Sequence, residues 1–183
     1  MKNLICLIPF IVFIGACKKD PPPDPPCTDN GLPCATTEGK NTFGCKVNGN
    51  NWVATAPPTI GGAEALSGEY DNTDGGFYLH AVRKNEDQTI FEAIYVFGKN
   101  IFAPGSYTIY INSTTKVGYI DLMKSTCSTY YYDSLNPGVL NITYLNSSET
   151  IISGTFYMDL FDTTCQDSII HITEGRFDFK YSY

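Results

Sequence analysis

The chain has 183 residues, with 19 acidic against 12 basic side chains, two histidines and a formal charge of −7 at pH 7. An acidic chain without a cluster of Lys and Arg is a poor partner for a phosphate backbone, so we expect no binding to nucleic acid. The length suffices for one domain with a real hydrophobic core.

The first 16 residues have the pattern of a secretory signal peptide. Lys2 precedes an apolar run over 4–16, which is shorter than the roughly 20 residues of a membrane-spanning helix. The run ends in the sequence IGAC at 14–17, which resembles the lipobox of bacterial lipoproteins. This resemblance implies that Cys17 is lipidated, with a diacylglyceryl group on sulfur and an acyl chain such as palmitate on the new amine. Cleavage before Cys17 then makes it the first residue of the mature protein.

The residue after Cys17 indicates whether the protein is held in the inner or the outer membrane. An Asp in this place retains many lipoproteins in the inner membrane, whereas this chain has Lys18. We therefore expect a lipid-anchored protein of the outer membrane, either surface-exposed or facing the periplasm. The run from Lys18 to Asp20 partly resembles a surface-export signal; a solvated charge run at the N-terminus is an equal interpretation.

Prolines occupy five of the six positions from 21 to 26. Such a segment favours extended polyproline II and acts as a semi-rigid spacer, the alternative being a ligand for a proline-recognition domain. We therefore divide the chain into a signal peptide at 1–16, a lipid-anchored Pro-rich tether at 17–41 and a β-rich domain at 42–183.

Five cysteines remain once the signal peptide and the lipidated cysteine are set aside. In an oxidising compartment these are disulfide candidates first. Cys27 and Cys34 could close a small ring within the tether, and Cys127 and Cys165 could join two strand ends, which leaves Cys45 as a buried thiol. A bridge from Cys45 to Cys127 or Cys165 is the alternative. Zinc-type ligand spacing is missing, so we expect no metal and no cofactor.

From residue 42 onward, apolar and polar residues alternate with a period of two, which is typical of half-buried strands. The clearest run is GRFDFKYSY, which places Phe177, Phe179, Tyr181 and Tyr183 on one face and Arg176, Asp178, Lys180 and Ser182 on the other. Asn48-Gly49 predicts a tight hairpin turn. About ten short strands without a helical stripe predict an antiparallel β-sandwich, or alternatively a flattened β-barrel.

Several motifs resemble a family of short Bacteroidota-type lipoproteins of unknown function. They are the opening FGCKVNGNNW at 43–52, ISGTF at 152–156 and GRFD at 175–178. The resemblance covers the chain from about residue 42 onward and implies an outer-membrane lipoprotein with a β-rich domain. Cys127 and Cys165 fall where such members often carry a cysteine pair. No activity or catalytic residue comes with the resemblance.

The sequence contains no nucleophile elbow, metalloprotease motif or phosphate loop, so we predict no catalytic residues. His80 and His171 lie in separate predicted strands. Four carboxylates could in principle meet in a cleft, and they keep a glycan hydrolase open as the alternative function. These are Glu69, Glu92, Glu149 and Glu174.

The favoured function is a non-catalytic binding or structural module that the lipid holds on the envelope, with a glycan or an envelope protein as its partner. The chain has 13 tyrosines, and three of them follow one another in the run TYYY at 129–132. Alternation turns Tyr131 to the face opposite Tyr130 and Tyr132. Aromatic side chains of this kind either pack across strands or form an exposed row for sugar rings. An exposed row favours the glycan, whereas a cleft with two suitably spaced carboxyl groups favours the hydrolase.

We predict that the Cys17→Ser variant loses acyl labelling and accumulates as uncut precursor, because the thiol that receives the lipid is gone. Metabolic labelling with a fatty-acid probe, followed by membrane fractionation and N-terminal sequencing, measures both effects. Cleavage before residue 17 with retained membrane attachment in this variant would contradict the anchor.

Overall fold

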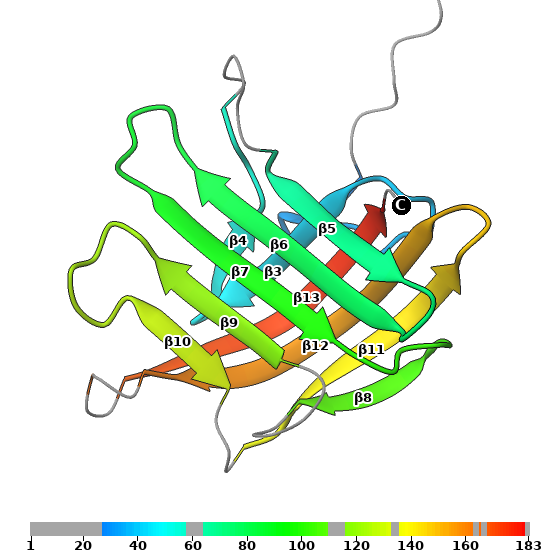
Figure 1. Cartoon of the computed structure of the whole chain (residues 1–183). Coiled ribbons are helices and arrows are strands. Elements are labelled where there is room, and N and C mark those ends of the chain that lie inside the picture. The colour runs from blue at the N-terminus through cyan, green and yellow to red at the C-terminus, as the bar shows by residue number, and fades with distance from the viewer. Residues whose placement is uncertain are drawn as a thin grey trace, which may run out of the picture.

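The computed structural model describes residues 27–57, 64–109, 116–132, 136–162, 165 and 168–181. The predicted signal peptide, Cys17 and the prolines at 21–26 lie outside these ranges. The described residues form an all-β fold, as the alternation predicts (Figure 1). Its strands are β1 Thr28–Asp29, β2 Leu32–Pro33, β3 Thr42–Val47, β4 Asn50–Val53, β5 Leu66–Asp71, β6 Gly76–Lys84, β7 Phe91–Gly98, β8 Gly105–Ile109, β9 Lys116–Asp121, β10 Thr129–Tyr132, β11 Gly138–Asn146, β12 Ile151–Phe161 and β13 Ile169–Lys180.

All strands except β1 and β2 belong to one curled antiparallel sheet. The order β5-β6-β7-β9-β10 forms the front layer in Figure 1, and β4-β3-β13-β12-β11-β8 forms the layer behind it. The layers join where β10 pairs with the end of β12. Away from this join, Thr55 forms a parallel bridge to Arg83, with two backbone hydrogen bonds of 2.8 Å to the neighbouring residues of β6. The sandwich is therefore a half-barrel, between the two architectures expected.

The core lies between the layers and follows the predicted alternation. On β12, the inward side chains of Ile152, Phe156, Met158 and Leu160 are all buried. Large core side chains from other strands are Phe43, Trp52, Phe77, Leu79, Ile94, Leu140, Phe177 and Phe179. Residue 183 of the clearest run lies outside the described residues.

The turn at Asn48-Gly49 joins β3 to β4 as expected. Asn48 has a φ of 50° and Gly49 a φ of 80°, the left-handed conformation that this two-residue turn requires. The Asn48 side chain also accepts a hydrogen bond from the His171 amide at 2.9 Å. The turn is thereby fixed to β13, and Trp52 on β4 is held against Phe43 with ring centroids 5.7 Å apart.

The described part of the segment assigned to the tether packs on the domain. The disulfide Cys27–Cys34 closes the small sheet of β1 and β2. The side chain of Leu32 is fully buried, and Pro33 lies so close to Gly44 of β3 that a Cβ on Gly44 would come within 2.6 Å of it. The sequence predicts only a small ring within the tether here; the two additional strands explain part of the difference from about ten strands to thirteen.

Asp178 holds the next part of this segment against β13. Its carboxylate accepts hydrogen bonds from the Thr36 hydroxyl at 2.5 Å and the Ser153 hydroxyl at 2.7 Å. It also accepts from the backbone N–H groups of residues 38, 39 and 40 at 2.9 to 3.1 Å. Burial raises the pKa of Asp178, but these hydrogen bonds outweigh burial and leave the pKa below its ordinary value. An ion pair of Asp178 with Arg176, as the shared face suggests, is not formed: Arg176 instead contacts Asp29.

The second disulfide joins Cys127, between β9 and β10, to Cys165, between β12 and β13. Both disulfides are the pairs that the sequence favours, and Cys45 is a buried free thiol. Burial is the main cause that raises the pKa of Cys45 to about 12. The thiol therefore remains protonated and unreactive in the folded protein at neutral pH.

We expect the Cys127→Ser/Cys165→Ser variant to lose about 4 kcal/mol of unfolding free energy, because the bridge closes a loop of 38 residues. For a domain of this size, such a loss lowers the melting temperature by roughly 10 °C. Differential scanning calorimetry measures it, with Cys45→Ala as the control that removes a thiol but no crosslink. A non-reduced peptide map that links residue 45 to either cysteine would refute the pairing.

The Asp178→Asn variant should be less stable than the parent at pH 7 by about 2 kcal/mol, since five donors lose a charged acceptor. The folded pKa of Asp178 is lowered, so its contribution is complete above the ordinary Asp pKa and disappears as the pH falls through the folded pKa. Urea unfolding between pH 7 and pH 2 should show the difference shrinking toward the acid end. Asp159→Asn, at an exposed pair with His171, is the control, and a pH-independent difference for Asp178→Asn would contradict this account.

Candidate functional site

One row of outward side chains crosses the sheet at right angles to the strands. Strand register aligns its members pair by pair, from β5 through β6, β7, β9, β10 and β12 to β13. In this order they are Ser67, His80, Tyr95, Gly118, Tyr131, Phe161 and Ile169. We call these seven residues the outer row. The row passes over the join between the layers without a break.

The second half of the outer row is apolar and exposed. Tyr131, Phe161 and Ile169 show 48%, 36% and 43% of their surface to solvent. Neighbouring strands bring these side chains into cross-strand contact range. Tyr130, in contrast, is buried and lies beside the Ser168 hydroxyl at 2.9 Å, so Tyr130 and Tyr131 face opposite sides as predicted. Single exposed apolar residues need no explanation, but three aligned ones indicate a contact surface.

Gly118 forms a gap in the row that the ring of Tyr95 fills. A Cβ placed on Gly118 would lie 2.1 Å from Cζ and Oη of Tyr95. The far end of the Tyr95 ring therefore lies over Gly118 on β9, and Gly118 is opposite Tyr131 in the strand register. A side chain at position 118 would occupy the space of this ring.

Polar groups lie along one side of the row. His80 stacks on Tyr78, with ring centroids 6.4 Å apart, and burial lowers the pKa of His80, so its imidazole is neutral at pH 7. Two residues from Phe161 and Ile169, the Nδ1 atom of His171 lies 2.7 Å from a carboxylate oxygen of Asp159. His80 is thus a member of the row on β6, whereas His171 lies beside its other end on β13, and the two histidines do not form a pair.

An open pocket of about 470 Å³ borders the front layer at the turn between β5 and β6. Its walls include Glu69, Asp71, Asp74, Tyr78, Phe97 and Lys99. The turn residues are locally satisfied: Asp71 accepts from the Thr73 amide at 2.8 Å, and Asp74 accepts from the Gly76 amide at 2.7 Å. These bonds hold the hairpin turn between β5 and β6.

Glu92 lies inside the sandwich, in a polar cluster near the bridge at Thr55. One of its oxygens accepts hydrogen bonds from Trp52 Nε1 at 2.6 Å and from Arg83 Nε at 2.8 Å. Burial, followed by the charges of Glu92 and Asp121, raises the pKa of Tyr119 far above its ordinary value. The cluster satisfies charges at the end of the core, which is a structural role for Glu92 and for the only tryptophan of the chain.

The four glutamates considered for a glycan hydrolase do not lie together in the structure. Glu92 is engaged inside, Glu174 pairs with Lys46 at 2.5 Å, and Glu149 accepts from the Tyr144 hydroxyl at 2.8 Å. Only Glu69 borders the pocket. Within the described ranges, no group of three His, Cys, Asp or Glu residues could hold a metal ion.

Three further observations concern the predicted sites and relatives. The lipidation residue Cys17 lies outside the described residues. In the part of the chain that the structure describes, no helix is long and apolar enough to cross a membrane. Comparisons with protein-family models, curated proteins and solved structures give no match.

Tyr95, Phe161 and Ile169 are members of the row that the sequence does not single out. The signal is present in the run FEAIYVFG of β7, where Glu92, Ile94 and Val96 share the inner face. Tyr95 and Phe97 lie on the opposite face of β7, so the sequence indicates that this strand has apolar residues on both faces. Strand order is still needed to align Tyr95 with Tyr131, and periodicity alone does not provide it.

Proposed function

We propose that this chain is a non-catalytic, lipid-anchored module of the bacterial outer membrane that binds carbohydrate through its outer row. The observation that carries the proposal is the exposed aromatic alignment of Tyr131 and Phe161, continued by the ring of Tyr95 over Gly118. Aromatic faces offer sugar rings an apolar surface, and the tyrosine hydroxyl adds a polar group at low conformational cost.

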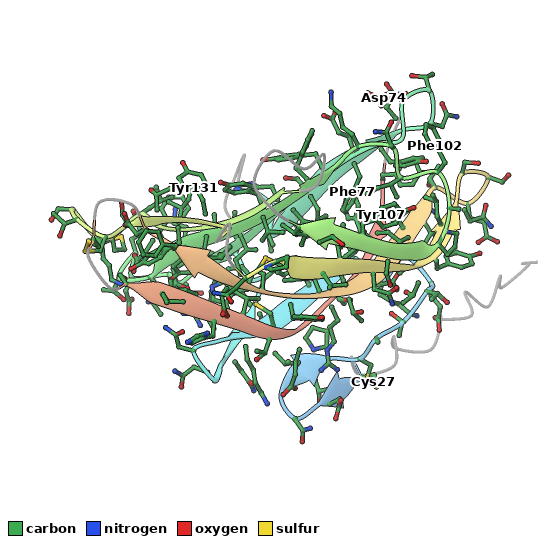
Figure 2. All side chains as sticks on the ribbon, turned by 90° about the horizontal axis from the view of Figure 1, so that it is seen from below. Cys27, Asp74, Phe77, Phe102, Tyr107 and Tyr131 are labelled. Atoms are coloured by element: carbon green, nitrogen blue, oxygen red, sulfur yellow. A yellow bond between two sulfur atoms is a disulfide. The ribbon has the colours of Figure 1, made fainter. Side chains whose placement is uncertain are left out.

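The position of the row fits an anchored protein. Figure 2 shows Tyr131 on the upper layer and Cys27 beneath the lower layer. The chain enters the described domain at Cys27, on the face opposite Tyr131. An anchor that precedes Cys27 therefore leaves Tyr131 accessible to a glycan. The lipobox and the motifs shared with Bacteroidota-type lipoproteins support this location.

The arrangement of carboxylates favours binding over hydrolysis. A glycosidase requires two carboxyl groups at a defined separation across the scissile bond. Here Glu92, Glu149 and Glu174 are occupied by contacts in three different parts of the fold. The pocket beside Glu69 is the place where the hydrolase alternative can be tested, through release of reducing sugar by the parent protein and by Glu69→Gln.

The decisive experiment is a glycan array with the mature protein and two tyrosine variants. We expect the parent to bind a subset of glycans and Tyr131→Ala to lose at least about tenfold in affinity, since a central aromatic contact is removed. Tyr157→Ala is the matched control, because Tyr157 is an equally exposed β12 tyrosine that lies outside the row. The proposal fails when the parent binds no glycan, or when both variants bind like the parent.

A further inference from the structure

The chain contains two Asn-Gly turns that have the same backbone shape. Asn30-Gly31 joins β1 to β2, with φ angles of 52° and 80°, and Asn48-Gly49 joins β3 to β4, with φ angles of 50° and 80°. An asparagine followed by glycine is prone to lose its side-chain amide, because the glycine carries no Cβ that hinders the approach of its nitrogen to the asparagine side chain. The two turns differ in what holds them.

Asn48 is fixed to the middle of the sheet through both its backbone and its side chain. Its backbone N–H donates to the His171 carbonyl at 2.9 Å, and its side-chain oxygen accepts from the His171 N–H at 2.9 Å. His171 belongs to β13, which pairs with both β3 and β12 and is therefore among the elements that open last. The carboxamide carbon of Asn48 reaches the Gly49 nitrogen only after this double contact breaks.

Asn30 lies on an exposed hairpin with fewer contacts. Its carbonyl accepts a hydrogen bond from the Asn51 side chain at 2.8 Å, and no described residue forms a hydrogen bond with its carboxamide. The hairpin has two residue pairs, and both Asn30 and Gly31 are exposed. The disulfide Cys27–Cys34 closes the end of the hairpin opposite the turn. The turn can therefore rearrange once a single exposed hydrogen bond opens.

From this difference we propose that Asn30 is a site of spontaneous deamidation to isoaspartate, and that the same reaction is suppressed at Asn48. The Gly31 nitrogen attacks the carboxamide carbon of Asn30. A new N–C bond forms, the bond to the side-chain nitrogen breaks, and the Gly31 amide proton leaves with that nitrogen as ammonia. Water then opens the resulting succinimide ring at one of its two N–C bonds and gives isoaspartate or aspartate. The net reaction converts one amide and one water into one carboxylic acid and one ammonia.

The product changes the hairpin in two ways. Isoaspartate adds a methylene to the main chain of a two-residue turn, and the register of a hairpin depends on the length of its turn. The new carboxylate also follows directly on Asp29, which pairs with Arg176 at 3.1 Å, so it places a second like charge beside this ion pair. We therefore expect the modified hairpin, which buries Leu32 against the domain, to open more often. This inference is independent of the proposed carbohydrate binding.

The test follows both asparagines in one sample. The mature protein is incubated at 37 °C and pH 8, and a parallel sample is unfolded in guanidinium chloride with a thiol reductant. Peptide mapping, with electron-transfer fragmentation to distinguish isoaspartate from aspartate, gives both rates. In the folded protein, Asn30 should react at least about tenfold faster than Asn48, because Asn48 must first lose two hydrogen bonds. In the unfolded chain, glycine follows both residues, and the two rates should agree within about twofold.

One variant and one exchange measurement locate the effect. Asn51→Ala removes the hydrogen bond to the Asn30 carbonyl and should raise the rate at Asn30, while Asn48 in the same molecule serves as the control. The Cys34 amide donates to the Cys27 carbonyl at 3.2 Å. In isoaspartyl molecules this amide should exchange with deuterium faster than in unmodified ones. Asn30→Asp adds the charge without the methylene and separates the two causes of opening.

Each outcome supports or overturns the inference. A clear excess of the rate at Asn30 that disappears on unfolding supports it. Equal rates at the two asparagines in the folded protein, or a faster rate at Asn48, overturn it. Absence of reaction at Asn30 in the folded protein also overturns it, because the turn shape alone then protects both residues. Reaction at Asn30 with unchanged exchange of the Cys34 amide retains the modification site and overturns the opening of the hairpin.

Discussion

The pairing of β10 with the last two residues of β12 is the contact on which the rest of the structure depends. β12 pairs with β11 as far as Tyr157, and with β10 at Leu160 and Phe161, so this one strand belongs to both layers. Because side chains alternate along a strand, a slip of one residue here would turn Tyr131 inward and a core side chain outward. The disulfide between the loops that flank this join opposes such a slip.

A buried and a half-buried carboxylate, Asp178 and Glu92, have structural roles although carboxylates of this kind can also act in catalysis. Asp178 secures the segment at 36–40 against β13, and Glu92 neutralises Arg83 while it orients the indole of Trp52. A buried charge is tolerated only when donors surround it, and each of these has several. These two carboxylates therefore have structural roles, whereas the outer row remains available for contact with other molecules.

Period-two alternation predicted the strand faces and the Asn48-Gly49 turn because both are local properties of the backbone. It placed Asp178 on the correct face, beside Arg176, but it did not predict that this face is buried there. The segment at 36–40 covers Asp178, and a covering by residues far away in sequence leaves no periodic signal. The outer row was only partly predictable: alternation placed Tyr131 and Tyr130 on opposite faces, whereas the alignment of Tyr131 with Tyr95 and Phe161 depends on strand order.

The docking of β1 and β2 on the sheet restricts the motion of the chain where it enters the domain. With Leu32 buried and Asp29 paired to Arg176, the chain is held against the domain from its first described residues. Under the proposed lipid anchor and carbohydrate binding, this would limit how far each molecule can turn on its membrane. A polymer held by one molecule would then meet the same surface of its neighbours at high effective concentration, and weak single contacts would add up to durable attachment through avidity.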